Sequence, residues 1–382
     1  MYSVSSYGRM IADKVRTEAY LQALRQVVNS DSVVLDLGTG IGIFGILACQ
    51  LGVRRVYAIE PDDAIQLARE IARANHFSDR IVFIQDLSNH VTLPERADVI
   101  ITDLHGVLPL YGHLIPSIAD ARKRLLVPDG VLIPQTERLW ISLVEAPDLY
   151  LHHTVPWGKD VYGLNVEPWR RIVTNTWRKA HVKPEQLLVE PRCWATLDYA
   201  TMEDPNLSAT TSWIGKREGT AHGIVVWFDS QLGDGVAFSN APGAPELIYG
   251  NAFFPLLAPL TIVLGDVVTV QLDAHLVGKD YVWRWQTRVQ ESNGEKRLKA
   301  NFKQSTFFGA PLTSERLRKR SAAHVPVLND DGKLKNLILS LMNGQMSLEQ
   351  IAQQLTLQFP ERFSEWQDAL DLVGQTSQKY SQ

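Results

Sequence analysis

Residues 33–45, with the sequence VVLDLGTGIGIFG, decide the fold of the first part of the chain. An apolar run that contains Asp36 leads into three glycines spaced two apart, and an apolar helical run follows. The pattern is typical of a buried parallel strand that ends in a tight turn, where glycines let the backbone approach a ligand. The helix after the turn begins with unpaired N–H groups. We therefore predict a nucleotide-type pocket at the carboxyl end of this strand.

The acid inside the glycine motif decides which nucleotide we expect. Dinucleotide-binding folds favour the spacing GxGxxG, whereas Asp36 here precedes glycines at every second position. Glu60 ends the next apolar run, where its carboxylate can accept hydrogen bonds from both hydroxyls of a ribose. A ligand with a ribose and no phosphate suits this acidic loop, so we predict S-adenosylmethionine (SAM) as the cofactor. An NAD site and a glycine-rich turn without a chemical role are the alternatives.

Composition and charge exclude several classes of protein. The chain of 382 residues is long enough for two or three domains, and 45% hydrophobic with 21% charged residues is typical of a globular protein. A formal net charge of −4 argues against nucleic acid as a partner. Two cysteines provide neither a disulfide framework nor a metal site. Because we find no apolar stretch of membrane-spanning length and no signal peptide, we expect a cytoplasmic protein without membrane contact.

Strands and helices alternate over the first part of the chain. We expect strands at residues 33–37, 55–60, 81–85, 99–102 and 130–133, and amphipathic helices at 43–51, 64–75 and 115–125. This alternation predicts an α/β fold with a Rossmann-like, doubly wound parallel sheet. Ligands of such sheets bind beyond the carboxyl ends of the strands. We assign residues 1–145 to a SAM-binding domain that includes an N-terminal helix.

Two further stretches provide candidate ligand contacts. Met10 lies in the helix expected ahead of the first strand, which could cover the cofactor, and Arg16 follows it. Arginine offers two parallel donors to a carboxylate, so Arg16 is a candidate partner for a ligand carboxylate, with a solvated helix charge as the alternative. After the third strand, Asp86 could meet the adenine amino group, with Leu87 and Ser88 beside the ring. An exposed loop acid is the alternative for Asp86.

The composition changes after Pro147. Aromatic residues and threonine become frequent, and apolar and polar residues alternate, which predicts an antiparallel, β-barrel-like domain over residues 146–312. Within it, residues 162–179 have a helical pattern with several tryptophans, and exposed aromatic residues suggest an interface. Residues 325–382 contain short helical patterns and form a third, small domain.

The chain resembles the protein arginine methyltransferase family over roughly residues 5–290. The residues that carry the resemblance are MI-x-DKVRT at 10–17, VLDLGTG at 34–40, IE at 59–60, AN at 74–75, LP at 93–94, ADVI at 97–100, DG at 129–130, IP at 133–134, VYGL at 161–164 and AFS at 237–239. The resemblance implies that Arg16 contacts the carboxylate of SAM and that Glu60 binds its ribose. It also implies that Gly38 and Gly40 contact the methionine part and that Asp36 orients the loop.

The same resemblance implies how the chain assembles. The segment around Tyr162, residues 157–185, corresponds to the dimerisation arm of the family. We therefore expect a head-to-tail homodimer, with an ordinary loop as the alternative for the arm. Met10, by contrast, is placed with the cofactor-binding residues.

The loop after the fourth strand departs from the family. Arginine methyltransferases place two glutamates there that hold the substrate guanidinium, and the matching positions here are Asp103 and Gly112. A buried guanidinium without its partner charge costs roughly 3–5 kcal/mol, which argues against arginine as the substrate. Asp103 and His105 could instead act as general base for a neutral nucleophile, with His113 as a weaker candidate. A packed or solvated loop residue is the alternative for His105.

The last residues, 325–382, resemble the small winged-helix peptide-chaperone domains found with ribosomal-peptide maturation enzymes. The matching features are LN-x-x-G at 328–332, LM-x-G at 341–344 and IA-x-x-L at 351–355. Such domains bind a leader peptide by adding a strand to a sheet edge. A helical cap or a dimer element is the alternative.

These observations predict a SAM-dependent methyltransferase that acts on a peptide or protein nucleophile other than ordinary arginine. One alternative is a SAM-binding scaffold or peptide adaptor that has lost catalysis. The other is a methyltransferase of a small metabolite.

Overall fold

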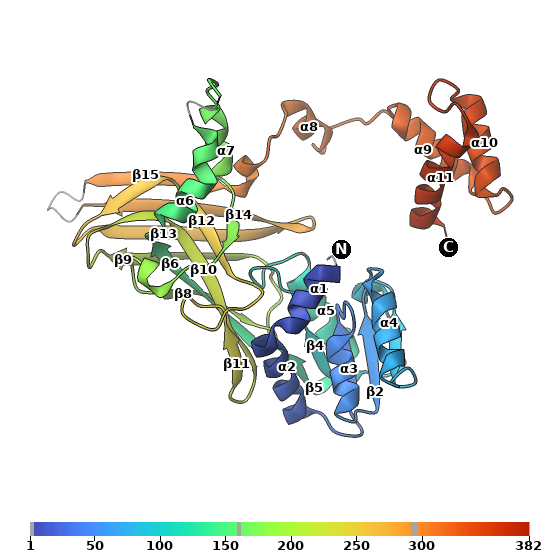
Figure 1. Ribbon diagram of the computed structural model, residues 1–382, viewed down its shortest axis with the longest axis horizontal. Helices are drawn as coiled ribbons and strands as arrows, with labels where there is room; N and C mark the ends of the chain where they lie inside the picture. The colour runs from blue at the N-terminus through green and yellow to red at the C-terminus, as the bar shows by residue number, and fades with distance from the viewer. Residues whose placement is uncertain (1–3, 159–161, 292–296, 382) are drawn as a thin grey trace. The chain divides into compact units, whose positions relative to one another are not determined.

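The computed structural model describes residues 4–158, 162–291 and 297–381, and it divides into two compact units, Met1–Pro311 and Leu312–Gln382. Figure 1 shows the elements of both units. We describe each unit by itself. Among the described residues, no helix combines the length and the apolar composition that crossing a membrane requires.

The first half of the larger unit is the predicted parallel sheet. Its strands lie in the order β3-β2-β1-β4-β5, and neighbouring strands are parallel throughout. The strands are β1 Val33–Leu37, β2 Arg55–Ile59, β3 Ile81–Ile84, β4 Ala97–Thr102 and β5 Leu126–Ile133. The helices are α1 Val4–Ala12, α2 Lys14–Val27, α3 Ile43–Gln50, α4 Ala64–Ala74 and α5 Leu114–Leu125, with the short 3₁₀ helix η1 Ser88–His90. The Rossmann-like prediction is confirmed.

The strand order places the ligand-binding edge at β1. The chain leaves β1 for β2 on one side and returns to β4 on the other, so β1 and β4 flank the point where the strand order reverses. In open α/β sheets, ligands bind in the crevice outside the carboxyl ends of the strands at this point. All five residues of β1 are buried, which explains its continuous apolar run.

The second half of the larger unit consists of two antiparallel sheets. One has the order β7-β12-β10-β6-β8 with β11 paired to β10, and the other has the order β15-β14-β13-β9. The strands are β6 Thr136–Val144, β7 Arg178–Ala180, β8 Arg192–Asp198, β9 Leu207–Ile214, β10 Gly219–Gly233, β11 Val236–Ser239, β12 Asn251–Ile262, β13 Val267–Val277, β14 Asp280–Gln290 and β15 Leu298–Ser305. Short 3₁₀ helices occur at Pro184–Gln186 (η4) and Thr306–Gly309 (η5). The predicted antiparallel β architecture is confirmed.

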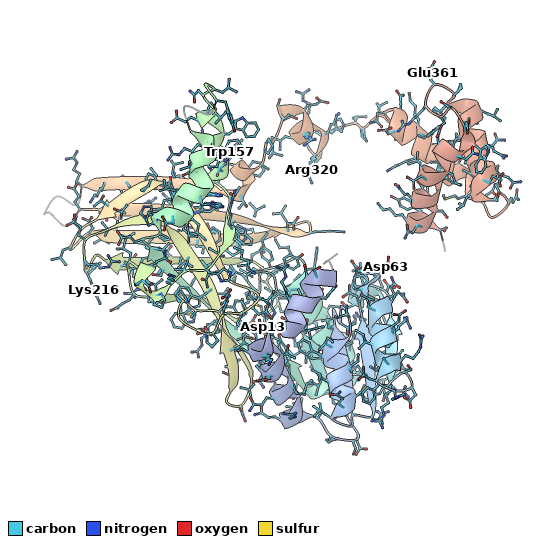
Figure 2. All side chains as sticks on the ribbon, in the orientation of Figure 1. Asp13, Asp63, Trp157, Lys216, Arg320 and Glu361 are labelled. Atoms are coloured by element: carbon cyan, nitrogen blue, oxygen red, sulfur yellow. The ribbon has the colours of Figure 1, made fainter. Side chains whose placement is uncertain are left out.

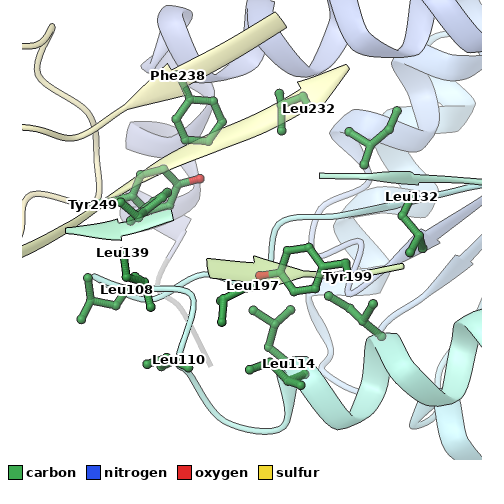
Figure 3. Close-up of a cluster of buried hydrophobic side chains, with 14 of the residues drawn as sticks. Leu108, Leu110, Leu114, Leu132, Leu139, Leu197, Tyr199, Leu232, Phe238 and Tyr249 are labelled. Carbon is green, nitrogen blue, oxygen red and sulfur yellow. The ribbon is translucent and has the colours of Figure 1, made fainter. Parts of the chain in front are cut away.

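One hydrophobic core joins the parallel sheet to the β-strands that follow it. Figure 3 shows buried side chains from both halves, among them Leu114 of α5 and Leu132 of β5 from the first half and Leu139 of β6 and Leu197 of β8 from the second. These residues belong to the same buried cluster. The half with the parallel sheet and the β half therefore hold each other in a fixed arrangement, which matters because the candidate site lies between them.

The predicted arm stands out from the β-strands in Figure 1. The predicted arm, residues 157–185, contains η3 Glu167–Trp169, α7 Arg170–Val173 and β7, and α6 Pro147–Thr154 and η2 Val155–Trp157 lead into it. Residues 159–161 of the predicted arm lie outside the described residues. The continuous helix predicted for residues 162–179 is wrong. Tyr162 and Gly163 both have positive φ and form a turn, and Arg178 already belongs to β7. Tyr162 is fully exposed.

The smaller unit is helical. Its helices are α8 Ser314–Lys319, α9 Asp330–Leu341, α10 Leu348–Gln358 and α11 Trp366–Tyr380, and α9–α11 pack around their own buried apolar cluster. Asn329 and Ser347 cap α9 and α10 through their side chains. No strand occurs in the described residues 312–381. The predicted helical domain is present, but the strands of a winged-helix domain, and with them an edge for peptide addition, are missing there.

Candidate active site

A cavity of about 440 Å³ opens at the carboxyl ends of β1, β2 and β4. Its walls come from the two N-terminal helices, the loop between β1 and α3, the end of β2, the loop after β4 and three residues of the β half, Lys179, Ile248 and Tyr249. The lining includes Met10, Arg16, Gly38, Gly40, Glu60, Asp103, His105, Tyr111, Ile248 and Tyr249. Sequence-distant segments therefore meet around one space of a size suited to a nucleoside-type ligand.

The glycine loop has the close approach that the sequence predicts. Gly38 and Gly40 have φ of 72° and 54°, in the left-handed region that favours glycine. A Cβ on Gly38 would lie 2.2 Å from Cδ2 of Leu104, and one on Gly40 would lie 3.0 Å from Cε1 of Tyr7. Any side chain at Gly38 would therefore displace the wall of the cavity.

Asp36 lies behind the glycine loop and holds its shape. Its Oδ2 accepts hydrogen bonds from Oγ1 of Thr39 at 2.5 Å and from the backbone N–H of Gly45 at 2.8 Å. The carboxyl is buried, and this burial raises its pKa to about 6. These contacts are those of a residue that orients the loop, as the family resemblance implies.

Glu60 lines the cavity at the end of β2. Its Oε2 accepts from the backbone N–H of Gly40 at 3.0 Å, and its Oε1 accepts from that of Asp62 at 3.0 Å. Burial raises the pKa of Glu60. Each carboxylate oxygen has two acceptor positions, so both oxygens keep capacity for the two hydroxyls of a ribose.

Arg16 reaches the cavity from α2 and is buried there. Its Nε donates to Oδ2 of Asp103 at 2.5 Å and lies 3.0 Å from the hydroxyl of Tyr249, and its Nη2 forms an ion pair with the same carboxylate. Its Nη1 donates to the carbonyl of Met10 at 3.2 Å. The alternative of a solvated helix charge is therefore excluded, and the first partner of Arg16 is a protein carboxylate.

Asp13 fixes the helices that carry Arg16. It is labelled in Figure 2 and lies between α1 and α2. Its Oδ1 accepts from the backbone N–H of Arg16 at 3.1 Å, and its Oδ2 accepts from that of Ile248 at 2.8 Å. One side chain thus caps α2 and ties it to the loop of the β half that lines the cavity.

The structure does not bring Asp86, Leu87 and Ser88 into the cavity. Asp86 is exposed and accepts from the backbone N–H of Leu87 at 2.6 Å, and it lies 3.0 Å from Nδ1 of His90. Leu87 is exposed, and Ser88 begins η1. The side chain of Asp86 makes local contacts in a turn after β3, the edge strand of the sheet. The structure therefore favours the alternative in which Asp86 is an exposed loop acid and not a ligand contact.

Asp103 and His105 belong to a buried chain of charges that crosses from the SAM-binding half to the β half. Asp103 Oδ1 lies 2.6 Å from Nδ1 of His105 and accepts from the hydroxyl of Tyr249 at 2.6 Å. Nε2 of His105 lies 2.6 Å from Oε1 of Glu137, whose Oε2 accepts from the hydroxyl of Tyr199 at 2.5 Å. His105 and Glu137 are both buried.

The charge states of this network follow from its contacts. Burial alone would lower the pKa of His105, but Glu137 and Asp103 outweigh it and raise the pKa to about 10. Burial would likewise raise the pKa of Asp103, but Arg16 and His105 lower it to about 2. Asp103 is ionised and His105 is protonated at neutral pH.

This geometry argues against the general-base role that the sequence predicts for Asp103 and His105. A protonated imidazole with a carboxylate on each ring nitrogen has no lone pair for a substrate proton. A carboxylate with a pKa near 2 is a weak base. The exposed His113 stands at the start of α5 and does not line the cavity.

The second carboxylate position of the family is open. Gly112 has a φ of 49°, and a Cβ there would meet no heavy atom of the described residues within 4 Å. Glu137 is a second buried acid that reaches the network through His105, and it was not among the predicted site residues. The strand pattern contains a signal for it, because alternation places Glu137 on the same buried face of β6 as Leu139 and Ile141.

Comparison with known proteins gives matches over most of the larger unit. The family model of ribosomal protein L11 methyltransferase (PrmA) matches residues 14–134, and that of the arginine methyltransferase oligomerization subdomain matches residues 135–285. The probable protein arginine N-methyltransferase 6 of Arabidopsis thaliana is 29% identical over 64% of this chain, which spans 58% of that relative's length. Protein arginine N-methyltransferase 1 of Dictyostelium discoideum is also 29% identical, over 71% of this chain and 82% of its own.

Solved structures share the fold. The Trypanosoma brucei PRMT1 enzyme–prozyme heterotetrameric complex with AdoHcy matches with a TM-score of 0.71 and 22% identity, over 78% of this chain and 96% of that one. Protein arginine methyltransferase 10 of Arabidopsis thaliana matches with a TM-score of 0.67 and 22% identity, over 80% and 98% of the two chains.

Proposed function

The chain belongs to the protein arginine methyltransferase family of SAM-dependent methyltransferases, and from this premise we propose that it methylates a peptide or protein nucleophile. The observation that carries the proposal is the cavity in which Arg16, the glycine loop and Glu60 converge. When bound, SAM supplies an electrophilic methyl group on a sulfonium. The residues of this chain then bind and orient the two reactants, since methyl transfer depends mainly on positioning.

The residues around the cavity fit SAM. Gly38 and Gly40 present only backbone to the cavity, where the methionine part would lie, and a Cβ at either position would push Leu104 or Tyr7 out of place. Glu60 has acceptor capacity for the ribose, and Arg16 provides a cation for the carboxylate at the opposite wall. Asp36 holds the glycine loop in this conformation through its hydrogen bond to the backbone of Gly45. We propose these residues, with Met10 covering the site from α1, as the SAM contacts.

The charges on the acceptor side favour a neutral nucleophile over a guanidinium. Arg16 and His105 balance Asp103 and Glu137 in the buried network, so its net charge is near zero. A guanidinium would meet one carboxylate that Arg16, His105 and Tyr249 already occupy, and the position of the second acid holds Gly112. Leaving such a cation incompletely paired costs roughly 3–5 kcal/mol.

The weak basicity of Asp103 restricts the acceptor further. With a pKa of about 2, this carboxylate does not remove a proton before transfer. The acceptor must therefore be nucleophilic as an uncharged group, such as a neutral nitrogen. Methylation gives that nitrogen a positive charge, and ionised Asp103 on the cavity wall stabilises this charge as it develops.

Arginine methylation is the second candidate, because the relatives are named arginine methyltransferases. One assay separates the two. Purified protein is incubated with SAM and a peptide library that includes arginine-containing and arginine-free members, and products are mapped by mass spectrometry. Products on neutral nitrogens support the first candidate, and products confined to arginine replace it with the second.

Binding of SAM is tested separately by isothermal titration. We expect Glu60→Ala to weaken SAM by about tenfold or more through loss of the ribose contacts, whereas Asp86→Asn, outside the cavity, leaves the affinity unchanged. Wild-type protein that fails to bind SAM would refute the proposal. Binding without any methylated product leaves the scaffold alternative.

For assembly we propose a homodimer formed through the arm. Tyr162 and Leu164 are exposed apolar side chains on this projecting segment, and the region belongs to the oligomerization subdomain match. Light scattering of the double variant Tyr162→Ser, Leu164→Ser should show monomers where the wild type shows dimers. A wild-type monomer at assay concentration would contradict this assignment.

The smaller unit is the candidate for peptide recruitment, through its helices rather than through strand addition. A chain ending at residue 311 tests this role, because the larger unit has its own core. Undiminished methylation of a small molecule by that truncated chain would favour the small-metabolite alternative.

A further inference from the structure

Glu137 is a fully buried carboxylate whose two oxygens are both engaged. Oε1 faces Nε2 of His105 at 2.6 Å, and Oε2 accepts from the hydroxyl of Tyr199 at 2.5 Å. Glu137 lies on β6, outside the SAM-binding half, and it does not line the cavity. Its influence on the cavity must therefore pass through His105.

His105 is held in one orientation from every side. Its ring stacks on Phe228 with centroids 5.4 Å apart and an interplanar angle of 1°, and Tyr249 packs edge-on at 5.5 Å. The titratable groups that face it directly are Asp103 after β4, Glu137 on β6 and Tyr249 before β12. Other titratable groups reach His105 only through these residues. Arg16 and Tyr20 of α2 contact Asp103, and Tyr199 after β8 contacts Glu137.

We propose that Glu137 is a positioning residue for methyl transfer: acting through His105, it orients the Asp103 carboxylate at the cavity wall and keeps the acceptor side electrically neutral. The inference rests on the proposed function and deepens it. Glu137 fixes the imidazole as a cation by accepting from Nε2, and the cation in turn donates from Nδ1 to Asp103. Asp103 is thereby held between two cations, Arg16 of α2 and His105 of the loop after β4.

The surroundings of Glu137 argue for a role beyond stability. Figure 3 shows Tyr199 and Tyr249 among leucines of the core that joins the two halves, including Leu139 and Leu197. An apolar residue at position 137 would suit such surroundings, and replacing a buried ion pair with apolar residues often leaves stability unchanged or improves it. A buried charge pair that ends at the wall of a cofactor cavity is the arrangement expected of a functional site.

The isosteric variant Glu137→Gln tests the proposal. It removes the charge and keeps an acceptor for Nε2 of His105. We expect kcat to fall by about 10- to 100-fold through misplacement of Asp103, while the affinity for SAM measured by titration stays within about twofold. An equal loss of kcat and of SAM affinity, or unchanged kcat, would overturn the proposal.

The protonation state of His105 gives a readout that needs no acceptor. With ¹⁵N-labelled histidine, NMR of the wild type should show a doubly protonated His105 up to about pH 9. In Glu137→Gln the ring has lost the largest cause that keeps it charged, so it should titrate at lower pH, and kcat should fall as pH rises through that value. A variant ring that stays charged like the wild type would overturn the proposal even if the acceptor is never identified.

Two further variants keep the test decisive if Glu137→Gln folds poorly. Tyr199→Phe removes one hydrogen bond from Glu137 without changing any charge, and we expect the same pattern with a smaller loss of kcat. The double variant Glu137→Gln, His105→Gln removes both charges together, and it should fold better than His105→Gln alone yet remain slow. Full activity of this double variant would show that the pair has no role in catalysis.

Discussion

The two walls of the cavity are built from the sequence in different ways. The cofactor wall uses local contacts: Asp36 and Gly45 are 9 residues apart, and Gly40 and Glu60 are 20 apart. The acceptor wall uses distant ones, since Asp103 lies 87 residues from Arg16 and 146 from Tyr249. The first wall is a strand–turn–helix unit with a cofactor pattern of its own, whereas the second exists only when both halves of the larger unit are packed together.

The largest expected effect is on the cofactor wall, where Gly38→Ala should lower the affinity for SAM by about 100-fold or more. A side chain at positive φ costs roughly 1–2 kcal/mol, and the new Cβ would lie 2.2 Å from Leu104. Isothermal titration measures the loss. Gly8→Ala is the matched control: Gly8 lies in α1, and a Cβ there would meet no described atom within 4 Å. Equal affinity of both variants would show that the glycine loop does not cradle the cofactor.

On the acceptor wall, His105→Gln should affect stability first. It leaves Glu137 buried without its cation, which costs about 3–5 kcal/mol in the free energy of unfolding. The added variant Glu137→Gln should recover part of that loss, because the unpaired charge disappears. Urea denaturation of the two single variants and the double variant measures the coupling. Additive losses would contradict a direct ion pair between these residues.

The pH dependence of stability tests the charge states of the acceptor wall. The pKa of His105 is raised from 6.5 to about 10, so the folded state binds a proton that the unfolded state has released over this range. The stabilisation is complete below about pH 6.5 and is lost as pH rises through about 10. Denaturation curves should show the free energy of unfolding falling with pH in this window, and Glu137→Gln should flatten the slope. At the acid end, Asp103, with its lowered pKa, stabilises the fold above about pH 4 and loses this effect as pH falls through about 2.

The same contrast explains what could be predicted from sequence. The alternation of strands and helices, the glycine turn and the places of Asp36 and Glu60 follow from patterns within about 30 residues, because each is tied to its neighbours by a strand–turn–helix unit. The position of Asp103 and His105 after β4 was also predictable, but their charges were not, since both depend on Glu137 and Arg16. Asp86 shows the opposite error: its place after a strand suggested a ligand contact, and the local turn took its carboxylate instead.

Gly112→Glu should have the smallest effect on activity, and it tests most directly whether arginine can be the methyl acceptor. The position is open, so a glutamate side chain has space to enter, although its φ of 49° costs roughly 1–2 kcal/mol for any residue with a side chain. A second carboxylate should make the neutral wall anionic and raise the yield of methylated arginine by a few-fold, about 1 kcal/mol of added attraction at a partly exposed site. Gly112→Gln has the same length without the charge and should bring no such gain, and mass spectrometry of arginine peptides measures both. If the glutamine variant gains as much as the glutamate variant, the missing charge at this position is not what disfavours a guanidinium, and the balance set by His105 and Glu137 must account for it.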